Sequence, residues 1–392
     1  MAPKLSLAEI LDLIFGLFQF ILQIIQYRII SLLGIEFSLA REKNLGIFKI
    51  GYVCRRFSIR QIWCVNPPLL TLISIAAIFL WRVCASCELG TNLGHSAITG
   101  ESSTRPTYLR YCESRNIKPC IEPVPNGGHA LWVDKKQSPE KVFVFIHGGG
   151  FHVGLSSGHI KFIDSVITEA KKSGVPLSTV ILGYDLAPES RYPTQLIQAI
   201  SLFKHILSSG ISPSQIILGG ESAGGNLILG LLSHILHPNP ELPILPGPVP
   251  QISGAIIISP WVSFDTNSES MQGYNSEHDT IFPGIIDAWS SSYLGSQEAR
   301  NAYSEPMRAP EGWWSDLQGV VKRILITAGA EEVMLDDLVK LSQILEGMKG
   351  VEFNLEKGPH AVPIHSNEEG GPEGSVMWSK QVMWVGETLK EV

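Results

Sequence analysis

The chain has 392 residues, with 30 lysines and arginines against 37 aspartates and glutamates, so its formal net charge is −7. This length exceeds the usual size of one domain and leaves room for one large α/β domain with additional segments. The net negative charge and the scattered basic residues do not indicate a surface that binds nucleic acid. No group of cysteines and histidines has metal-ligand spacing. We therefore expect no nucleic-acid partner, no metal and no cofactor.

The first hundred residues form a region of their own, which we assign to residues 1–104 and predict to be membrane-associated. Residues 11–35 are mostly apolar, but polar or small residues recur at steps of three and four: Asp12, Gly16, Gln19, Gln23 and Gln26. On a helix these positions form a narrow stripe beside a broad apolar face. The pattern predicts an amphipathic helix over about residues 5–35, lying either in a bilayer interface or in a core. Glu9 and Asp12 argue against a cleavable signal peptide.

A second apolar segment follows, because residues 61–81 carry no charged side chain. About twenty helical residues span the hydrocarbon core of a bilayer, so we predict a transmembrane helix over about residues 63–85. Trp63 and Trp81 would suit the two membrane interfaces. A buried hairpin of an extended cap domain is the alternative interpretation.

Basic residues lie mainly on one side of this segment. Lys49, Arg55, Arg56 and Arg60 precede it, and no lysine or arginine occurs between Arg82 and Arg105. Positive charge is retained on the cytoplasmic side of a membrane. The pattern predicts a single-pass protein, in the endoplasmic reticulum, with the remainder of the chain in the lumen.

All six cysteines precede the first strand of the predicted catalytic domain. In a lumenal domain, Cys112 and Cys120 could form a disulfide across a small loop. Free buried thiols are an equally good interpretation, since cysteine often acts as a small apolar side chain.

Residues 105–392 alternate between strand-like and helix-like segments. The predicted strands end near Ile146, Tyr184, Gly219, Ser259 and Ala328, and the predicted helices cover residues 160–172, 195–207 and 226–236. This alternation predicts an α/β fold, a mostly parallel sheet with helices on both faces. Residues 264–314 break the pattern and predict an insertion that projects over the site as a cap. This cap and the segment before Lys141 are expected to line the substrate pocket.

The apolar strand 142–146 ends in His147-Gly148-Gly149-Gly150-Phe151. Acyl transfer through a tetrahedral oxyanion needs N–H donors aimed at the developing charge, and consecutive glycines let the backbone approach the substrate. Backbone N–H groups of the Gly148–Gly150 loop and of Ala223 are therefore candidates for an oxyanion hole. A flexible glycine turn is the alternative. His147 is expected to brace the loop by hydrogen bonding.

Gly220-Glu221-Ser222-Ala223-Gly224 lies between the apolar run 215–218 and the predicted helix 226–236. A serine on such a tight strand-to-helix turn projects its hydroxyl above the edge of a parallel sheet. The small residues on either side are needed because bulky side chains could not pass one another in the turn. Ser222 is therefore the predicted nucleophile.

The predicted base and acid follow Ser222 in the chain. Glu332 comes just after the predicted strand 323–329, where a carboxylate would lie at the carboxyl edge of the sheet. Asp336 is the alternative acid, whereas Glu331 is expected to face solvent. His360 follows the short strand 351–355 and is the predicted base, with His365 as its rival.

Four stretches carry a resemblance to a known family. They are His147 to Phe151, Tyr184 to Pro193, Gly220 to Asn226, and Ser259 to Val262. With these motifs the chain resembles the hormone-sensitive-lipase-like branch of the α/β-hydrolases, the "fold-3" carboxylesterases, from about residue 105 to the C-terminus. Glu332 aligns with the acid position of that family, where aspartate is commoner.

The resemblance implies a serine carboxylesterase with the triad Ser222, Glu332 and His360. It is closest in layout to fungal steryl acetyl hydrolases and animal arylacetamide deacetylases, which are membrane-tethered. This layout implies a lipophilic ester as substrate, such as the acetate of a sterol, terpenoid or polyketide, with a role in secondary metabolism. An acyltransferase or amidase with the same triad, and a non-catalytic binding protein on this scaffold, are the alternatives.

Overall fold

The computed structural model of the protein describes residues 104–135, 141–361, 364 and 376–390. The predicted helices over about residues 5–35 and 63–85 lie outside these ranges. None of the helices within the described ranges has the length and apolar character needed to cross a bilayer.

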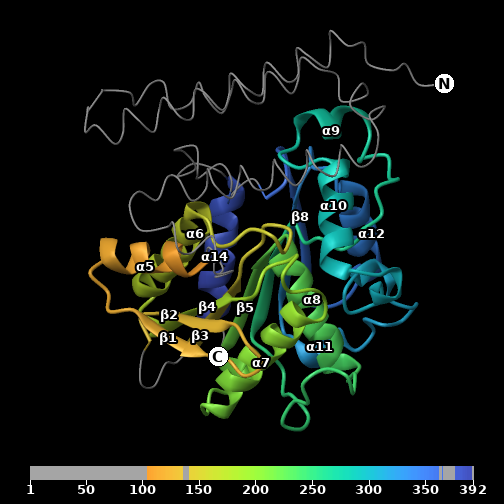
Figure 1. Ribbon diagram of the computed structural model, residues 1–392. Helices are drawn as coiled ribbons and strands as arrows, with labels where there is room; N and C mark the ends of the chain where they lie inside the picture. The colour runs from red at the N-terminus through yellow and green to blue at the C-terminus, as the bar shows by residue number, and fades with distance from the viewer. Residues whose placement is uncertain (1–103, 136–140, 362–363, 365–375, 391–392) are drawn as a thin grey trace, which may run out of the picture. The chain divides into compact units, whose positions relative to one another are not determined.

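Eight strands form one sheet in the described part of the chain, in the order β1-β2-β4-β3-β5-β6-β7-β8 (Figure 1). Their bounds are β1 Cys120–Pro123, β2 His129–Val133, β3 Lys141–Ile146, β4 Leu177–Gly183, β5 Ile216–Glu221, β6 Gly254–Ile258, β7 Ile324–Gly329 and β8 Val351–Glu356. The pairs β1–β2 and β2–β4 are antiparallel, whereas every pair from β4 to β8 is parallel. The sheet is therefore mostly parallel, as the sequence predicted.

The central strands are apolar because helices cover both faces of the sheet. Strands β3 to β7 are buried along their whole length. Such continuous apolar runs are typical of parallel strands, whereas a strand with one solvated face alternates. The edge strand β8 shows a mixed pattern of burial instead.

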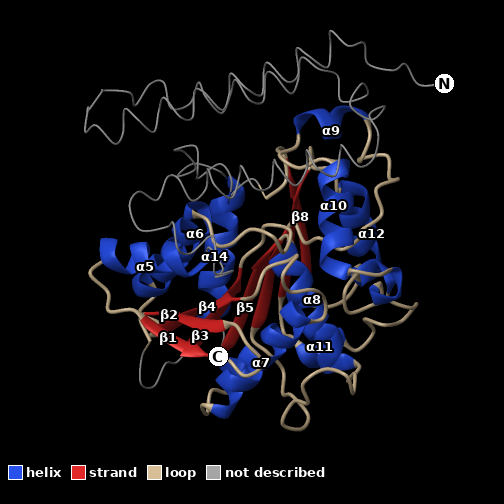
Figure 2. Cartoon of the chain, viewed as in Figure 1, coloured by secondary structure: helices blue, strands red, loops and turns tan. Residues whose placement is uncertain are grey.

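Helices form a layer on each side of the sheet (Figure 2). Their bounds are α5 Thr104–Ser114, α6 Ser157–Lys172, α7 Thr194–Ser208, α8 Ala223–Leu236, α9 Gly273–His278, α10 Pro283–Leu294, α11 Leu317–Val320, α12 Leu335–Leu345 and α14 Val376–Lys390, with short 3-10 turns at Pro213–Gln215, Gln297–Ala299 and Pro306–Arg308. Helices α5, α6 and α14 bury their apolar side chains in one core cluster. Helices α7, α8 and α12 contribute to the cluster on the other face.

The parallel register brings several loops to the same edge of the sheet. Ile146 at the end of β3 pairs with Gly220 in β5, and Glu221 pairs with Ile258 at the end of β6. The segments after β3, β5, β6 and β7 therefore leave the sheet together, at its carboxyl edge. These segments carry the glycine loop, Ser222 and Glu332.

One helix boundary differs from the sequence-based expectation. Helix α8 begins at Ala223, three residues before the predicted start at residue 226. Ser222 is its N-cap residue. The described residues before Lys141 form α5 and the antiparallel strands β1 and β2, and their place in the pocket lining stays a prediction. The insertion predicted over residues 264–314 contains α9, α10 and two 3-10 turns; we call it the cap.

Candidate active site

Ser222 occupies the turn between β5 and α8 in a conformation that L-residues rarely adopt. Its φ is 51° and its ψ is −114°. Its backbone is held on both sides, since its N–H donates to the Ile258 carbonyl (2.9 Å) and its own carbonyl accepts from Trp261 N (3.0 Å). Strain that the surroundings maintain in this way is typical of functional positions. The turn presents Ser222 with 7 % of its surface exposed.

The turn depends on small neighbours, as the sequence indicated. A Cβ on Gly224 would overlap the backbone carbonyl of Ile146, which belongs to the adjacent strand β3. The first turn of α8 therefore passes directly against the end of β3. This contact brings the N-terminus of α8 next to the glycine loop that follows β3.

The glycine loop is the segment from Gly148 to Gly150. Gly149 has φ 91° and Gly150 has φ 58°, values in the left-handed region that favours glycine. Among the described residues, no acceptor bonds the backbone N–H of Gly149, Gly150 or Ala223. These three groups lie at the same edge of the sheet and remain available to a bound oxyanion.

His147 braces this loop and does not act on a proton at neutral pH. Its Nδ1 donates to the Gly148 carbonyl (2.8 Å), and its Nε2 accepts from the Thr104 hydroxyl (2.8 Å). Its ring stacks on Tyr184, whose hydroxyl donates to the carbonyls of His147 and Gly148 (3.0 Å each). Complete burial lowers the pKa of His147 to about 3, so the ring stays neutral.

The predicted base and acid meet although 28 residues separate them. His360 Nδ1 donates to Glu332 Oε2 at 2.8 Å, and both side chains are buried. Glu332 is fixed in turn, because its Oε1 accepts from Gly329 N (2.6 Å) and from the Ser259 hydroxyl (3.2 Å). With its Nδ1 proton donated to Glu332, a neutral His360 carries its basic lone pair on Nε2.

Nε2 of His360 lies close to the carboxylate of the residue that precedes Ser222. It lies 3.7 Å from Oε1 of Glu221, the residue directly before the serine. The other oxygen of Glu221 accepts from His159 Nε2 at 2.9 Å. His159 Nδ1 accepts from Ser156 N (3.0 Å), which places the imidazole proton of His159 on Nε2.

The charges of this buried cluster favour a protonated His360. Burial alone would lower the pKa of its imidazole, but the carboxylates of Glu332, Asp279 and Glu221 oppose burial and raise the pKa. Burial also raises the pKa of Glu332, and the bond to His360 counteracts this rise. The arrangement stabilises the imidazolium that forms when a base takes the proton of a serine.

The remaining candidates lie elsewhere. Asp336 accepts from Ser270 N (2.8 Å) and has no contact with His360, whereas Glu331 accepts from the exposed Tyr274 hydroxyl (3.4 Å). His365 lies outside the described residues. Cys112 and Cys120 are free thiols and form no disulfide. In the described part of the chain, no group of three or more potential ligands could hold a metal.

Sequence reasoning missed three residues that contact this site. Ser259 donates to Glu332 and accepts from Ala361 N (3.2 Å), so it links the acid loop to the base loop. Trp289 of the cap covers Gly150, where a Cβ would overlap its ring. Asp279 bonds the backbone of both loops. Ser259 follows a strand at the carboxyl edge, which was a usable signal, but the cap residues have no such position in the sequence.

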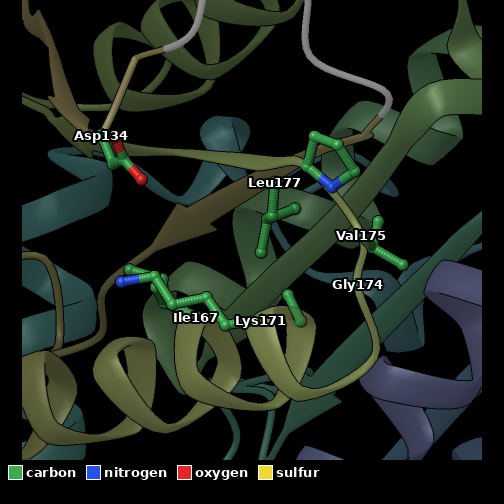
Figure 3. A pocket seen from close by; sticks show the side chains of 8 residues that line it. Asp134, Ile167, Lys171, Gly174, Val175 and Leu177 are labelled. Atoms are coloured by element: carbon green, nitrogen blue, oxygen red, sulfur yellow. The ribbon is translucent and has the colours of Figure 1, made fainter.

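A separate depression of about 300 Å³ lies away from this site. Figure 3 shows its lining, which includes Asp134, Ile167, Lys171 and Leu177. Leu177 begins β4 and Lys171 is in the last turn of α6, so the depression is at the amino edge of the parallel strands. Ligands of parallel sheets bind at the opposite edge, and we attach no function to this depression.

A serine on a strained strand-to-helix turn, a histidine oriented by a buried carboxylate, and a glycine loop at one sheet edge define a class, the serine hydrolases with this α/β architecture. A family model described as "alpha/beta hydrolase fold" matches residues 143–363. The chain belongs to this family, and within it to the hormone-sensitive-lipase-like branch of serine ester hydrolases, which confirms the resemblance seen in the sequence.

Individual relatives agree with this placement. An esterase of Acinetobacter venetianus is 29% identical, over 60% of this chain and 72% of its own length. Steryl acetyl hydrolase 1 of Saccharomyces cerevisiae is 26% identical, over 50% of this chain and 46% of its own. The crystal structure of EstE5 soaked with ethyl alcohol matches with a TM-score of 0.56 at 26% identity, over 69% of this chain and 85% of that one.

Proposed function

We propose that this protein is a membrane-associated esterase that removes a short acyl group, acetyl above all, from a lipophilic alcohol such as a sterol, terpenoid or polyketide. The observation that carries the catalytic part is the bond of 2.8 Å between His360 Nδ1 and Glu332 Oε2. Nε2 of the same ring lies 3.7 Å from Oε1 of Glu221, the residue directly before Ser222. The same geometry supports Ser222, Glu332 and His360 as the triad.

In the proposed reaction, Nε2 of His360 takes the hydroxyl proton of Ser222 as the serine oxygen attacks the ester carbonyl. Glu332 stabilises the imidazolium that results and keeps its ring in orientation. Backbone N–H groups of the glycine loop and of Ala223 bind the oxyanion. His360 then returns the proton to the departing alcohol, and water releases the acid from Ser222 by the same steps.

A short acyl group is supported by the position of Trp289. Its indole ring lies against Gly150 of the glycine loop, so little room is left beside the oxyanion donors. An acetyl group needs the least space of the common acyl groups. The relative named steryl acetyl hydrolase 1 also points to an acetate ester of a lipophilic alcohol.

The membrane part of the proposal rests on the sequence. The uncharged residues 61–81 are long enough for one membrane crossing, and basic residues cluster before them. A lipophilic substrate concentrates in a bilayer, so attachment to the membrane would bring the enzyme to its substrate. The proposed compartment is the lumen of the endoplasmic reticulum, and a role in secondary metabolism is consistent with such a substrate.

Hydrolysis of p-nitrophenyl acetate by the full chain and by Ser222→Ala tests the catalytic proposal. We expect the variant to lose about a millionfold in kcat, because the triad serine forms the covalent intermediate. Longer p-nitrophenyl esters should be poorer substrates than the acetate. Equal release by the two proteins would indicate a binding protein, and turnover that requires an added alcohol or amine would indicate a transferase.

A further inference from the structure

Asp279 joins the cap to both loops of the proposed acid–base pair. Its Oδ1 accepts from His360 N at 2.8 Å, and its Oδ2 accepts from Val333 N at 2.7 Å. Val333 directly follows Glu332, so one carboxylate binds the main chain at the base and next to the acid. The sequence separations are 81 and 54 residues.

Helix α9 of the cap directs a second side chain to the same place. Asn275 Nδ2 donates to the carbonyl of Glu332 at 2.9 Å. Asn275 and Asp279 are four residues apart, and Asp279 N bonds to the Asn275 carbonyl (2.9 Å), so the two side chains leave one face of the helical turn. Together they bind the peptide group between Glu332 and Val333 at its oxygen and at its nitrogen.

This arrangement restricts the backbone of the two loops and not the reacting side chains themselves. Glu332 sits in a loop after β7, and His360 sits in a loop after β8. Side-chain contact between loops is precise only if their backbones are held, and a misplacement of about 1 Å can cost about a hundredfold in rate. A charged acceptor makes stronger bonds to N–H groups than a neutral one.

We propose that Asp279 is a positioning residue for the esterase reaction, which holds the loops of Glu332 and His360 in register and places a negative charge beside the imidazole. The inference rests on the proposed function. Asp279 touches no reacting atom, so it acts through the two loops and through its charge.

The charge of Asp279 gives a signature that a purely structural contact would lack. The ionisable groups that face His360 among the described residues are Glu332 after β7, Asp279 in the cap and Glu221 at the end of β5, with His159 paired to Glu221. The Asp279 carboxylate is one of the groups that raise the pKa of His360. Its removal should therefore lower this pKa.

Asp279→Asn is the test, because asparagine keeps the size of the side chain but removes its charge and one of its two acceptor oxygens. We expect kcat for p-nitrophenyl acetate to fall by about tenfold to a hundredfold, with KM changed less than about twofold. The inflection of kcat/KM against pH should move to lower pH. Asp279→Glu keeps the charge and should leave the inflection in place while kcat still falls.

Asn275→Ala should lower kcat without moving the inflection, because the amide is neutral. Asp287→Asn is the matched control, since Asp287 is an exposed cap carboxylate that accepts from the Thr266 hydroxyl (3.0 Å). This control should retain the kcat and pH profile of the unaltered protein. Thermal unfolding of every variant identifies those that fail to fold.

An Asp279→Asn protein that folds and retains both kcat and the inflection would overturn the inference while leaving the proposed function intact. An equal loss of kcat in Asp279→Asn and in the control Asp287→Asn would also overturn the inference. Labelling of Ser222 by a fluorophosphonate, measured against pH, repeats the comparison without an ester substrate. If the unaltered protein neither turned over esters nor took up the label, the proposed function would fail, and the inference with it.

Discussion

Three carboxylates surround the single imidazole on which the proposed chemistry depends. Glu332 binds Nδ1 of His360, Glu221 lies 3.7 Å from Nε2, and Asp279 binds the backbone N–H. Each of these charges favours imidazolium, and together they raise the pKa of His360 above its ordinary value of 6.5. A base is active only when deprotonated, so activity should rise with pH through an inflection above about 6.5.

Glu332→Gln tests this electrostatic effect on His360. Glutamine keeps the length of the side chain but cannot stabilise the imidazolium, so we expect kcat to fall by about ten thousandfold. Removal of the negative charge should also lower the pKa of His360, and the inflection in kcat/KM should move to lower pH. Rates of p-nitrophenyl acetate hydrolysis between pH 5 and about 10 give both quantities.

The rival acid supplies the control for this experiment. Asp336→Asn should leave kcat within about twofold, because Asp336 binds Ser270 and not the histidine. An inflection that stayed in place in Glu332→Gln, or a larger loss in Asp336→Asn, would contradict the assignment of the acid.

The site residues that could be predicted from the sequence are those that follow a strand of the sheet. Ser222, Glu332 and His360 each follow a predicted strand, and parallel strands bring their carboxyl ends to one edge. The contact of Glu332 with His360 could therefore be anticipated. Asp279 comes from the cap, where no strand register relates it to the triad. Glu221 stood in the motif, but its pairing with His159 depends on how α6 packs, which no spacing reveals.

At the scale of elements, the prediction succeeded where hydrophobic patterns were continuous. Strands β3 to β7 are mostly apolar in sequence because both of their faces are covered. Helix α8 was predicted to begin three residues late, because Ala223, Gly224 and Gly225 lack the apolar periodicity of a helix. The lack of a side chain at Gly224 allows this turn of the helix to pass directly against Ile146.

In the proposed reaction, we expect helix α10 to limit the room available to the acyl group. Trp289 of this helix lies over Gly150, and the neighbouring His152 stacks on the same indole while its Nε2 bonds the Ser292 hydroxyl (2.9 Å). The cap is thus joined to the glycine loop by one helix. The size of the side chain at 289 should set the upper limit on acyl length.

Trp289→Ala should therefore accept longer acyl chains. We expect the ratio of kcat/KM for p-nitrophenyl octanoate to that for the acetate to rise by at least about tenfold, since each methylene in an apolar pocket contributes about 1–3 kcal/mol. Trp313→Ala is the matched control, because Trp313 packs against His237 and bonds Ser233, remote from the glycine loop. A ratio unchanged in Trp289→Ala, or raised equally in both variants, would show that Trp289 does not limit the acyl group.

At the scale of the whole molecule, the described residues belong to one compact unit, Arg82–Val392, and the proposed membrane attachment depends on the sequence before it. Two facts support that attachment, the uncharged residues 61–81 and the four basic residues that shortly precede them. The same facts predict the orientation of the chain in the membrane, because basic flanking residues stay on the cytoplasmic side. The catalytic unit would then enter the lumen, where asparagine glycosylation occurs.

The native sequence carries no Asn-x-Ser/Thr acceptor, so glycosylation of the unaltered chain cannot show which side of the membrane the catalytic unit occupies. Lys118→Thr would complete an acceptor at Asn116, and both residues are exposed just beyond the end of α5. We expect the full chain with this substitution, made in the presence of microsomes, to gain one glycan that an endoglycosidase removes. Adding Asn116→Gln should abolish the glycan, which identifies the site. A chain that stayed unmodified while it sedimented with the microsomes would place the catalytic unit in the cytoplasm and reverse the proposed orientation.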